Sequence, residues 1–412
     1  MTLVRAERAS PPKVVRYTVV RELPWLRAVV AAHAISMFGT VAADSALSLL
    51  MYRETKSSLY AALAFSVVFV PQAISGSLLG GVTGRYTTRT VLVGANAAGA
   101  FLAAAMASPW TPVGWQLALA AVLGAVAPIH DGARTAMLID ALEHDQFLAV
   151  RSALRMIAQL AVVSGFACGG LLSVVAGPRV VLLGNAASFV LATLLVCWAT
   201  AGAPECRSAA ERRISPVVAS LRAVAQVFRQ RSLRLTALRL WLPVSFAAAG
   251  TGLTVAYANE IGQGGTAVGL LLAAFAGGLV LGEIILSRIP AHARRRSAAW
   301  LILLTQLPTL GFAASPPLYV AIGLRVLSGG GFAYMQLIDS DLAQRCDRGM
   351  RRQVMIVVSS GAMACQGIAI AVAGALAQVG RPTLVIAGSG ACGTMACLAV
   401  LRRRDCPRSP PA

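Results

Sequence analysis

Apolar runs about as long as a bilayer is thick repeat along this 412-residue sequence and constrain its fold more than any other feature. A helix needs about 20 mostly apolar residues to cross a membrane. Hydrophobic residues make up 57% of the chain and charged residues 13%, whereas soluble domains have about 25% charged residues. Twelve runs qualify, at residues 26–51, 58–82, 90–108, 113–133, 153–176, 179–201, 235–257, 266–287, 298–314, 318–343, 353–378 and 382–401. The sequence therefore predicts a polytopic membrane protein with twelve transmembrane helices.

The strong positive charge of the chain follows the same pattern. The formal net charge is +20, from 36 Lys and Arg residues against 16 Asp and Glu. With the N-terminus in the cytoplasm, 31 of these 36 basic residues fall in inner segments and 4 in outer loops. Cytoplasmic loops of membrane proteins are enriched in Lys and Arg. This split predicts a plasma-membrane protein with both termini cytoplasmic, and it explains the charge without a nucleic-acid partner.

The first 25 residues and the cysteines indicate features that we do not expect in this protein. The N-terminal stretch is charged and contains proline, so we expect no cleaved signal peptide. The eight cysteines lie in predicted spans or inner segments, so no disulfide framework is expected. Because the sequence has neither a CxxC motif nor a Cys/His cluster, we predict no metal site and no cofactor.

A polar stretch at residues 202–234 divides the twelve predicted spans into six and six. When the second half is shifted by about 203 positions, Gly170 falls near Gly374 and the turn at 177–179 falls near 380–382. This common offset indicates a duplicated unit, and such repeats place a substrate site near the middle of the membrane. We predict an all-α fold of two pseudo-symmetric six-helix bundles. Its parts are a cytoplasmic arm (1–25), an N-terminal bundle (26–201), a cytoplasmic linker (202–234), a C-terminal bundle (235–401) and a cytoplasmic tail (402–412).

The predicted loop between the second and third spans contains the most specific motif. It reads Gly80-Gly-Val-Thr-Gly84-Arg85-Tyr-Thr-Thr-Arg89. This loop resembles that of the major facilitator superfamily, in which Gly is followed after three residues by Asp-Arg and a basic cluster. Gly80, Arg85 and Arg89 match the pattern, and Gly84 replaces Asp. In the family this loop acts as a cytoplasmic latch, so the resemblance implies a gating role for the three matching residues. Because Gly84 replaces the Asp, the latch of this chain would lack the family's carboxylate.

Other segments extend the resemblance over residues 25–403 and indicate one branch of the family. The segments Ser-Met-Phe-Gly at 36–39, Ala-Arg-Thr-Ala at 133–136 and Arg-Arg-Gln-Val at 351–354 resemble the enterobactin-exporter-like and macrolide-efflux-like branch. In the fifth span, Phe166 stands where antiporters of the family usually have Pro. The resemblance implies a proton-coupled secondary transporter that exports a small organic or drug-like compound.

Asp44 is the clearest acidic residue within a predicted span. It continues a polar stripe of His33, Ser36, Thr40 and Ser48, whose spacing of three or four residues places them on one helical face. Charged groups at membrane depth are costly and usually functional, and burial disfavours the charged form of a carboxyl group. We therefore predict that Asp44 is the proton-coupling carboxylate. The alternative is a structural hydrogen bond to a neighbouring helix.

Arg325 is the only Lys or Arg residue that lies well inside a predicted span, away from its ends. Three interpretations remain open: an ion pair with Asp44, attraction of an anionic substrate, or extension of the side chain to the outer interface. Glu283 is expected to form an ion pair at the membrane surface, near Arg288. Uncharged polar residues on other spans complete a predicted substrate cavity, whose residues are His33, Thr40, Gln72, Gln159, Arg325, Gln336 and Gln366.

Three classes of function remain open. The leading prediction is a secondary transporter that acts by alternating access as a monomer, with protons, a small-molecule substrate and the lipid bilayer as partners. An importer of a nutrient or metabolite is the first alternative, and it would favour a more polar cavity. The second alternative is a non-transporting receptor or scaffold, which would not explain the polar stripes within the predicted spans. We predict that the chain is not an enzyme, because it has four His and no HExxH motif.

Overall fold

The computed structural model describes residues 23–78, 87–200, 216–346 and 350–403. All regular structure in these ranges is helical. The first helices are α2 (Pro24–Thr55), α3 (Ser58–Ser66), α4 (Phe69–Leu78), α5 (Thr88–Ala107), α6 (Val113–Ala141), α7 (His144–Val175) and α8 (Pro178–Ala199). They are followed by α9 (Pro216–Arg229), α10 (Arg231–Gly252), α11 (Thr254–Glu260), α12 (Gly265–Arg288), α13 (Ala291–Leu310), the 3-10 helix η2 (Gly311–Ala314), α14 (Leu318–Gly331), α15 (Tyr334–Arg345), α16 (Arg351–Val379) and α17 (Pro382–Leu401).

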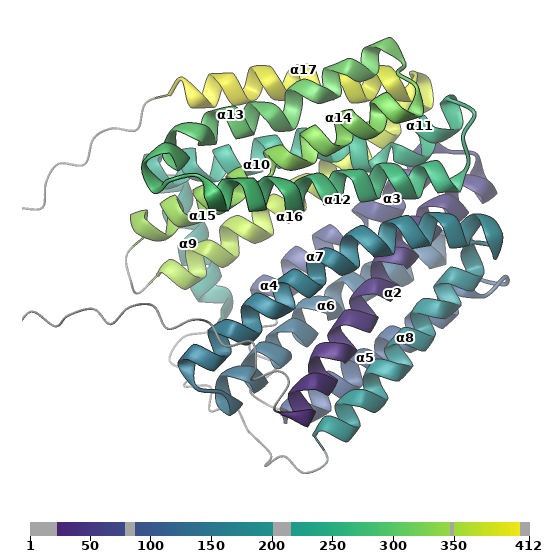
Figure 1. Ribbon diagram of the computed structural model, residues 1–412, viewed down its shortest axis with the longest axis vertical. Helices are drawn as coiled ribbons and strands as arrows, with labels where there is room; N and C mark the ends of the chain where they lie inside the picture. The colour runs from purple at the N-terminus through teal and green to yellow at the C-terminus, as the bar shows by residue number, and fades with distance from the viewer. Residues whose placement is uncertain (1–22, 79–86, 201–215, 347–349, 404–412) are drawn as a thin grey trace, which may run out of the picture.

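Eleven helical segments in the described ranges are long and apolar enough to cross a membrane, and the bent pair α10–α11 raises the number to twelve. This result confirms the predicted all-α polytopic fold. Figure 1 shows two groups of helices side by side, one formed by early helices and one by late helices. In the first group α2 packs against α7 and α8, and in the second α10 packs against α16 and α17. The groups meet where α7 lies along α12 and where α16 lies along α3 and α4.

Helix starts follow from local sequence. Pro24, Pro178 and Pro382 occupy the first turn of α2, α8 and α17, where a missing N–H costs nothing and the fixed φ suits a helix. Gly177 precedes α8 with a φ of +90°, a conformation that favours glycine. The Thr87 hydroxyl accepts a hydrogen bond from the N–H of Thr90 at the start of α5, which satisfies one of its unpaired donors.

Besides the bent pair α10–α11, two predicted spans are broken in the structure. The span predicted at 58–82 is interrupted after Ser66, and α4 begins at Phe69. Pro71 explains the break, because it cannot donate to the carbonyl of Val67 and its ring clashes with that group. The span predicted at 318–343 is interrupted between α14 and α15, directly after three consecutive glycines at 329–331. Glycine weakens a helix interior.

Other helices depart from the predicted boundaries. The fourth span was predicted to end at residue 133, but α6 continues to Ala141. The predicted linker at 202–234 contains the amphipathic helix α9 and the start of α10; its residues 201–215 lie outside the described ranges. Ala223 and Val227 of α9 are buried in a core cluster with Leu240 and Tyr334. This apolar face explains why the segment is helical although its sequence is rich in arginine.

The two groups of helices approach closely where α7 crosses α12. A Cβ atom added to Gly170 would lie within 3 Å of backbone atoms of Gly269, and one added to Gly269 would meet Gly170 and the carbonyl of Phe166. Small residues allow helix backbones in membrane proteins to approach in this way. This contact joins the early helices to the late helices.

Candidate functional site

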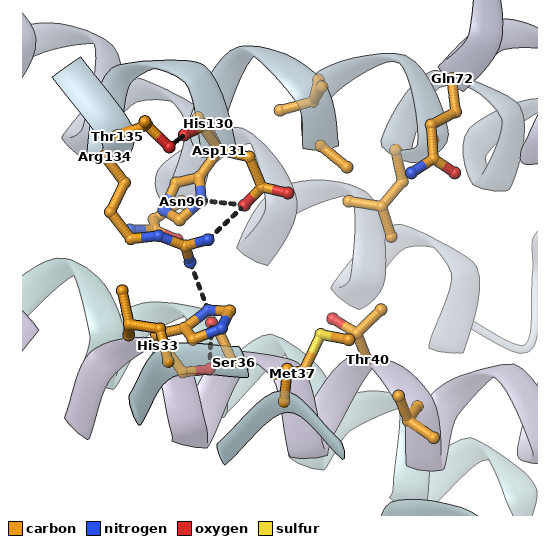
Figure 2. Close-up of a pocket in the computed structure, with 18 of the residues that line it drawn as sticks. His33, Ser36, Met37, Thr40, Gln72, Asn96, His130, Asp131, Arg134 and Thr135 are labelled. Atoms are coloured by element: carbon orange, nitrogen blue, oxygen red, sulfur yellow. Dashed lines mark hydrogen bonds and ion pairs between the residues drawn. The ribbon is translucent and has the colours of Figure 1, made fainter. Parts of the chain in front are cut away.

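A cavity of about 550 Å³ lies among the early helices. All of its lining residues belong to α2, α4, α5, α6, α7 or α8, or to the connection between α3 and α4. It extends from Asp44 and Gly124 in the middle of α2 and α6 to Leu138 and Phe147, where α6 ends and α7 begins. Figure 2 shows that side chains of α2 and α6 face one another across it.

The structure brings some of the predicted site residues together in this cavity. Four of them line it: His33, Thr40, Asp44 and Gln72. Four predicted cavity residues are not among its lining: Gln159, Arg325, Gln336 and Gln366. Of the predicted gating residues, Gly80 and Arg85 lie outside the described ranges, and Arg89 is exposed in the first turn of α5.

Asp44 is half-buried in α2 and faces the cavity. Within the described ranges its carboxylate has no hydrogen bond and no ion pair. The lining that it shares includes the apolar residues Val41, Val68, Phe69 and Leu123 and the uncharged polar residues Thr40 and Gln72. A carboxylate placed in apolar surroundings without a partner is costly. The alternative interpretation, a structural hydrogen bond to a neighbouring helix, has no counterpart among the described contacts.

A charged cluster lines the same cavity and was missed by the sequence analysis. The guanidinium of Arg134 donates a hydrogen bond to Nδ1 of His33 and pairs with Asp131, with 3.0 Å between the Arg134 and Asp131 side-chain atoms. His130 lies 3.7 Å from the same carboxylate. Figure 2 shows this cluster between α2 and α6. The Arg134 side chain is only 13% exposed, so its charge is held inside the protein by its two partners.

Asn96 on α5 is a second residue that the sequence analysis missed. It is buried, lines the cavity, and its Nδ2 has no hydrogen-bond partner among the described residues. An unsatisfied buried amide costs free energy. A polar atom of a bound molecule in the cavity would satisfy it. The surrounding sequence, a run of Gly and Ala, contains no signal for this role.

Arg325 lies in the other group of helices. Its side chain is 2% exposed, donates from one terminal nitrogen to Thr251 Oγ1 at 3.0 Å, and lies 4.6 Å from the ring centre of Phe275. Its Nε and the other terminal nitrogen have no hydrogen-bond partner among the described residues. It therefore does not pair with Asp44, and it does not extend to an interface. A buried guanidinium without a carboxylate partner is costly.

Polar contacts join the two groups of helices at the end where α2 stops and α12 starts. The Asn259 side chain donates a hydrogen bond of 2.8 Å to the Tyr52 hydroxyl, and the Gln378 amide hydrogen-bonds the Ser57 hydroxyl. Nearer the opposite end, Arg155 of α7 pairs with Glu283 of α12 at 3.0 Å. Glu283 was predicted to pair near Arg288, but its partner is contributed by the first group.

Within the described ranges no group of three or more His, Cys, Asp or Glu is placed to hold a metal ion. The polar groups of the cavity therefore include the carboxylate of Asp44, the amides of Gln72 and Asn96, and the cluster around Arg134. These groups bind protons and polar atoms of a ligand. They do not form the paired acid, base and nucleophile that a hydrolytic site needs.

Comparisons with known proteins agree with this architecture. The sequence model of the Major Facilitator Superfamily matches residues 29–258. The structure is similar to the crystal structure of nucleoside transporter NupG, with a TM-score of 0.73 and 11% identity over 92% of this chain and 100% of that chain. It is similar to peptide transporter POT in complex with sulfate, with a TM-score of 0.71 and 11% identity over 92% and 93% of the two chains. No curated protein matches the sequence. Because the family model covers more than half of the sequence, the chain belongs to the major facilitator superfamily, and it is a multi-pass membrane transporter and not an enzyme.

Proposed function

We propose that this transporter exports a small amphipathic organic compound in exchange for protons. It acts as a monomer in the plasma membrane, with both termini in the cytoplasm. The bundles of residues 26–201 and 235–401 rock against one another and expose the cavity to each side in turn. The direction of transport rests on the resemblance to the enterobactin-exporter-like and macrolide-efflux-like branch, and the orientation rests on the distribution of basic residues.

The observation that carries the proposal is the isolation of Asp44. Two carboxylates line the cavity, and they differ in their surroundings. Asp131 is 59% exposed and pairs with Arg134, so its charge is compensated. Asp44 is half-buried among apolar side chains and has no partner in the described ranges. Binding a proton is the simplest way for such a carboxyl group to lose its charge inside the membrane, and releasing it requires access to water. Alternating access supplies that access.

The lining of the cavity supports an amphipathic substrate. Most of its surface near Asp44 is apolar, with Met37, Val41 and Phe69 among the side chains that a hydrophobic group would contact. Asn96 on α5 offers a hydrogen-bond donor, Nδ2, that has no partner among the described residues. Ligand sites commonly combine a mainly apolar wall with a few polar groups that fix orientation. A strongly polar nutrient would leave this apolar part of the lining without matching contacts.

The contacts between the bundles support an inward-facing arrangement. The end with Tyr52 and Asn259 is closed by hydrogen bonds between the groups. At the other end the cavity reaches the exposed residues Arg151 and Arg155 of α7. Arg155 also pairs there with Glu283 of the other group, but its side chain remains 61% exposed. Under the proposed orientation this end is cytoplasmic, so a substrate from the cytoplasm would enter here.

The test is transport into everted membrane vesicles, in which export is measured as uptake. We expect an imposed pH gradient, acidic inside, to drive accumulation of compounds from a panel of hydrophobic drugs and siderophore-like molecules. Asp44→Asn should abolish the gradient-driven accumulation while the protein remains folded in the membrane. Asp140→Asn is the matched control, because Asp140 is an exposed residue near the end of α6 that does not line the cavity.

Two outcomes would contradict the proposal. If Asp44→Asn transports as the wild type does, Asp44 is not the coupling residue. If compounds accumulate in right-side-out vesicles with an inward proton gradient, and not in everted ones, the protein is an importer.

A further inference from the structure

A second cavity, of about 760 Å³, lies at one end of the late helices. It is enclosed by α10, α13, α15 and the last residue of α17, and none of its lining residues belongs to the cavity that contains Asp44. Figure 1 shows the ends of α13, α15 and α17 together at the left-hand end of the upper group. The proposed transport cycle gives this cavity no role.

Three arginines from three helices line this second cavity, and each is anchored. Arg239 on α10 donates to the carbonyl of Arg403 at 3.1 Å. Arg294 on α13 donates to the carbonyls of Ile289 and Ser287, at 2.6 Å each. These bonds cap the C-terminal end of α12, where a cation is also favoured by the helix dipole. Arg294 is thus held in place by the backbone.

The third arginine is anchored by a carboxylate. Arg345 on α15 pairs with Asp341 one turn earlier, with 2.7 Å between Nε and Oδ2. Among the described lining residues, three have guanidinium groups and one, Asp341, has a carboxylate. The formal charge of these described residues is therefore +2. Guanidinium groups bind phosphate well, because their donors match pairs of phosphate oxygens.

Apart from Ser340 and Gln344, the rest of the lining is apolar, and much of it lies deeper along the same helices. Ala298 and Ile302 follow Arg294 by one and two turns of α13, and Leu337 precedes Asp341 by one turn of α15. Both segments belong to predicted or observed spans that continue into the membrane. The cavity is thus basic at the surface and apolar toward the membrane interior, which is the polarity of a phospholipid.

We propose that this cavity binds the phosphate of an anionic phospholipid, with the arginines holding the headgroup and the apolar wall contacting the start of an acyl chain. Basic pockets between transmembrane helices on the cytoplasmic side are suited to anionic lipid headgroups. The basic residues at this end place it at the cytoplasmic leaflet. A soluble phosphate would satisfy the arginines but leave the apolar wall uncovered, and for this reason the geometry favours a lipid.

The test is lipid binding to the purified full-length protein in detergent, followed by native mass spectrometry. The probes are phosphatidylglycerol and phosphatidylcholine with the same acyl chains, with inorganic phosphate and glycerol phosphate as competitors. We expect phosphatidylglycerol to bind in preference to phosphatidylcholine. The variant Arg239→Gln/Arg345→Gln should bind it about 25-fold more weakly, because each basic residue near an anionic lipid contributes about a fivefold factor.

Two variants separate the site from a general effect of charge. Arg179→Gln/Arg381→Gln loses the same charge but at the opposite end, where both arginines pair with glutamates, and it should bind phosphatidylglycerol as the wild type does. Ala299→Leu fills the apolar wall without changing any charge and should also weaken binding. If the double arginine variant does not fold, Ala299→Leu still tests whether the lipid binds in this cavity.

Three results would overturn the proposal. The first is equal weakening in the Arg179→Gln/Arg381→Gln control, which would indicate non-specific electrostatic binding. The second is competition by millimolar inorganic phosphate or glycerol phosphate that is as strong as competition by the lipid, which would indicate a soluble anion as the ligand. The third is unchanged binding in Ala299→Leu.

Discussion

Arg134 on α6 donates a hydrogen bond to Nδ1 of His33 on α2, so a charged side chain of one helix is held by a ring nitrogen of another. Arginine has no acceptor atom. Nδ1 of His33 must therefore be unprotonated in this arrangement, and a neutral ring has its proton on Nε2. The bond crosses the end of the cavity where α6 approaches the first turns of α2.

This geometry predicts unequal coupling energies for the two partners of Arg134. The bond to His33 lies in a half-buried setting, whereas Asp131 is 59% exposed. In double-mutant cycles we expect His33→Ala and Arg134→Ala to couple by about 1–2 kcal/mol. Asp131→Asn and Arg134→Ala should couple by less than about 1 kcal/mol, as solvent-exposed pairs do. The free energies come from denaturant unfolding in detergent. Equal coupling energies would contradict this ranking.

The cluster around Arg134 also shows which part of the site could not be predicted from the sequence. The spans and the stripe that contains Asp44 follow from hydropathy and from helical periodicity. Arg134 fell just outside the span predicted at 113–133, so the sequence analysis did not place it beside the stripe that contains Asp44. Asp131 and Arg134 are three residues apart, a spacing that suits an ion pair on a continuous helix. This spacing was the sequence signal that could have predicted the pair. That His33 completes the cluster depends on packing between helices 101 positions apart.

The positions of the glutamines show the same limit. Gln72 lines the cavity whereas Gln159 does not, although both lie in predicted spans. Which face of a helix points inward depends on its rotation against its neighbours, and the apolar residues of a membrane helix do not reveal it, since lipid-facing and buried faces are both apolar. Asn96, buried in a run of small residues, was missed for the same reason.

Arg325 provides a second prediction. Arg325 is 2% exposed, and within the described ranges its guanidinium makes one hydrogen bond, to Thr251. Replacing buried charged groups by apolar residues of similar volume is often neutral or stabilising, by about 1–4 kcal/mol. We therefore expect Arg325→Met to unfold at a higher temperature in detergent than the wild type. Arg325→Ala should unfold at a lower temperature than Arg325→Met, because it leaves a cavity beside Phe275. A lower unfolding temperature for Arg325→Met would mean that the contacts with Thr251 and Phe275 outweigh the cost of burial.

Two glycines on α12 make a matched pair for a third prediction. A Cβ at Gly269 would lie within 3 Å of the Phe166 carbonyl and the Gly170 Cα, whereas one at Gly277 would meet nothing within 4 Å. Alanine is favoured over glycine in a helix by about 1 kcal/mol, so Gly277→Ala should leave stability unchanged or raise it. Gly269→Ala should lower the unfolding temperature, because only backbone atoms of α7 border the added methyl group. Similar shifts in both variants would mean that α7 and α12 do not pack as described.

The hydrogen bonds at the closed end lead to the last prediction. Tyr52 and Ser57 belong to one group of helices, and their partners Asn259 and Gln378 belong to the other. An exposed neutral hydrogen bond contributes about 0.5–1 kcal/mol. Removing both therefore shifts the ratio of open to closed states at this end by about five- to thirtyfold. We expect Tyr52→Phe combined with Gln378→Ala to increase the population in which this end is open.

Spin labels on exposed positions at that end measure this population. Ala176, at the end of α7, and Gln263, between α11 and α12, belong to different groups of helices and are exposed. With the eight native cysteines replaced, the double variant should add a longer-distance component to the distance distribution between labels at these positions. Tyr60→Phe is the control, because it also removes a hydroxyl group from an exposed tyrosine of the same group and should leave the distribution as it is. An unchanged distribution in the double variant would show that the close packing of Gly170 on Gly269, and not these hydrogen bonds, keeps this end closed.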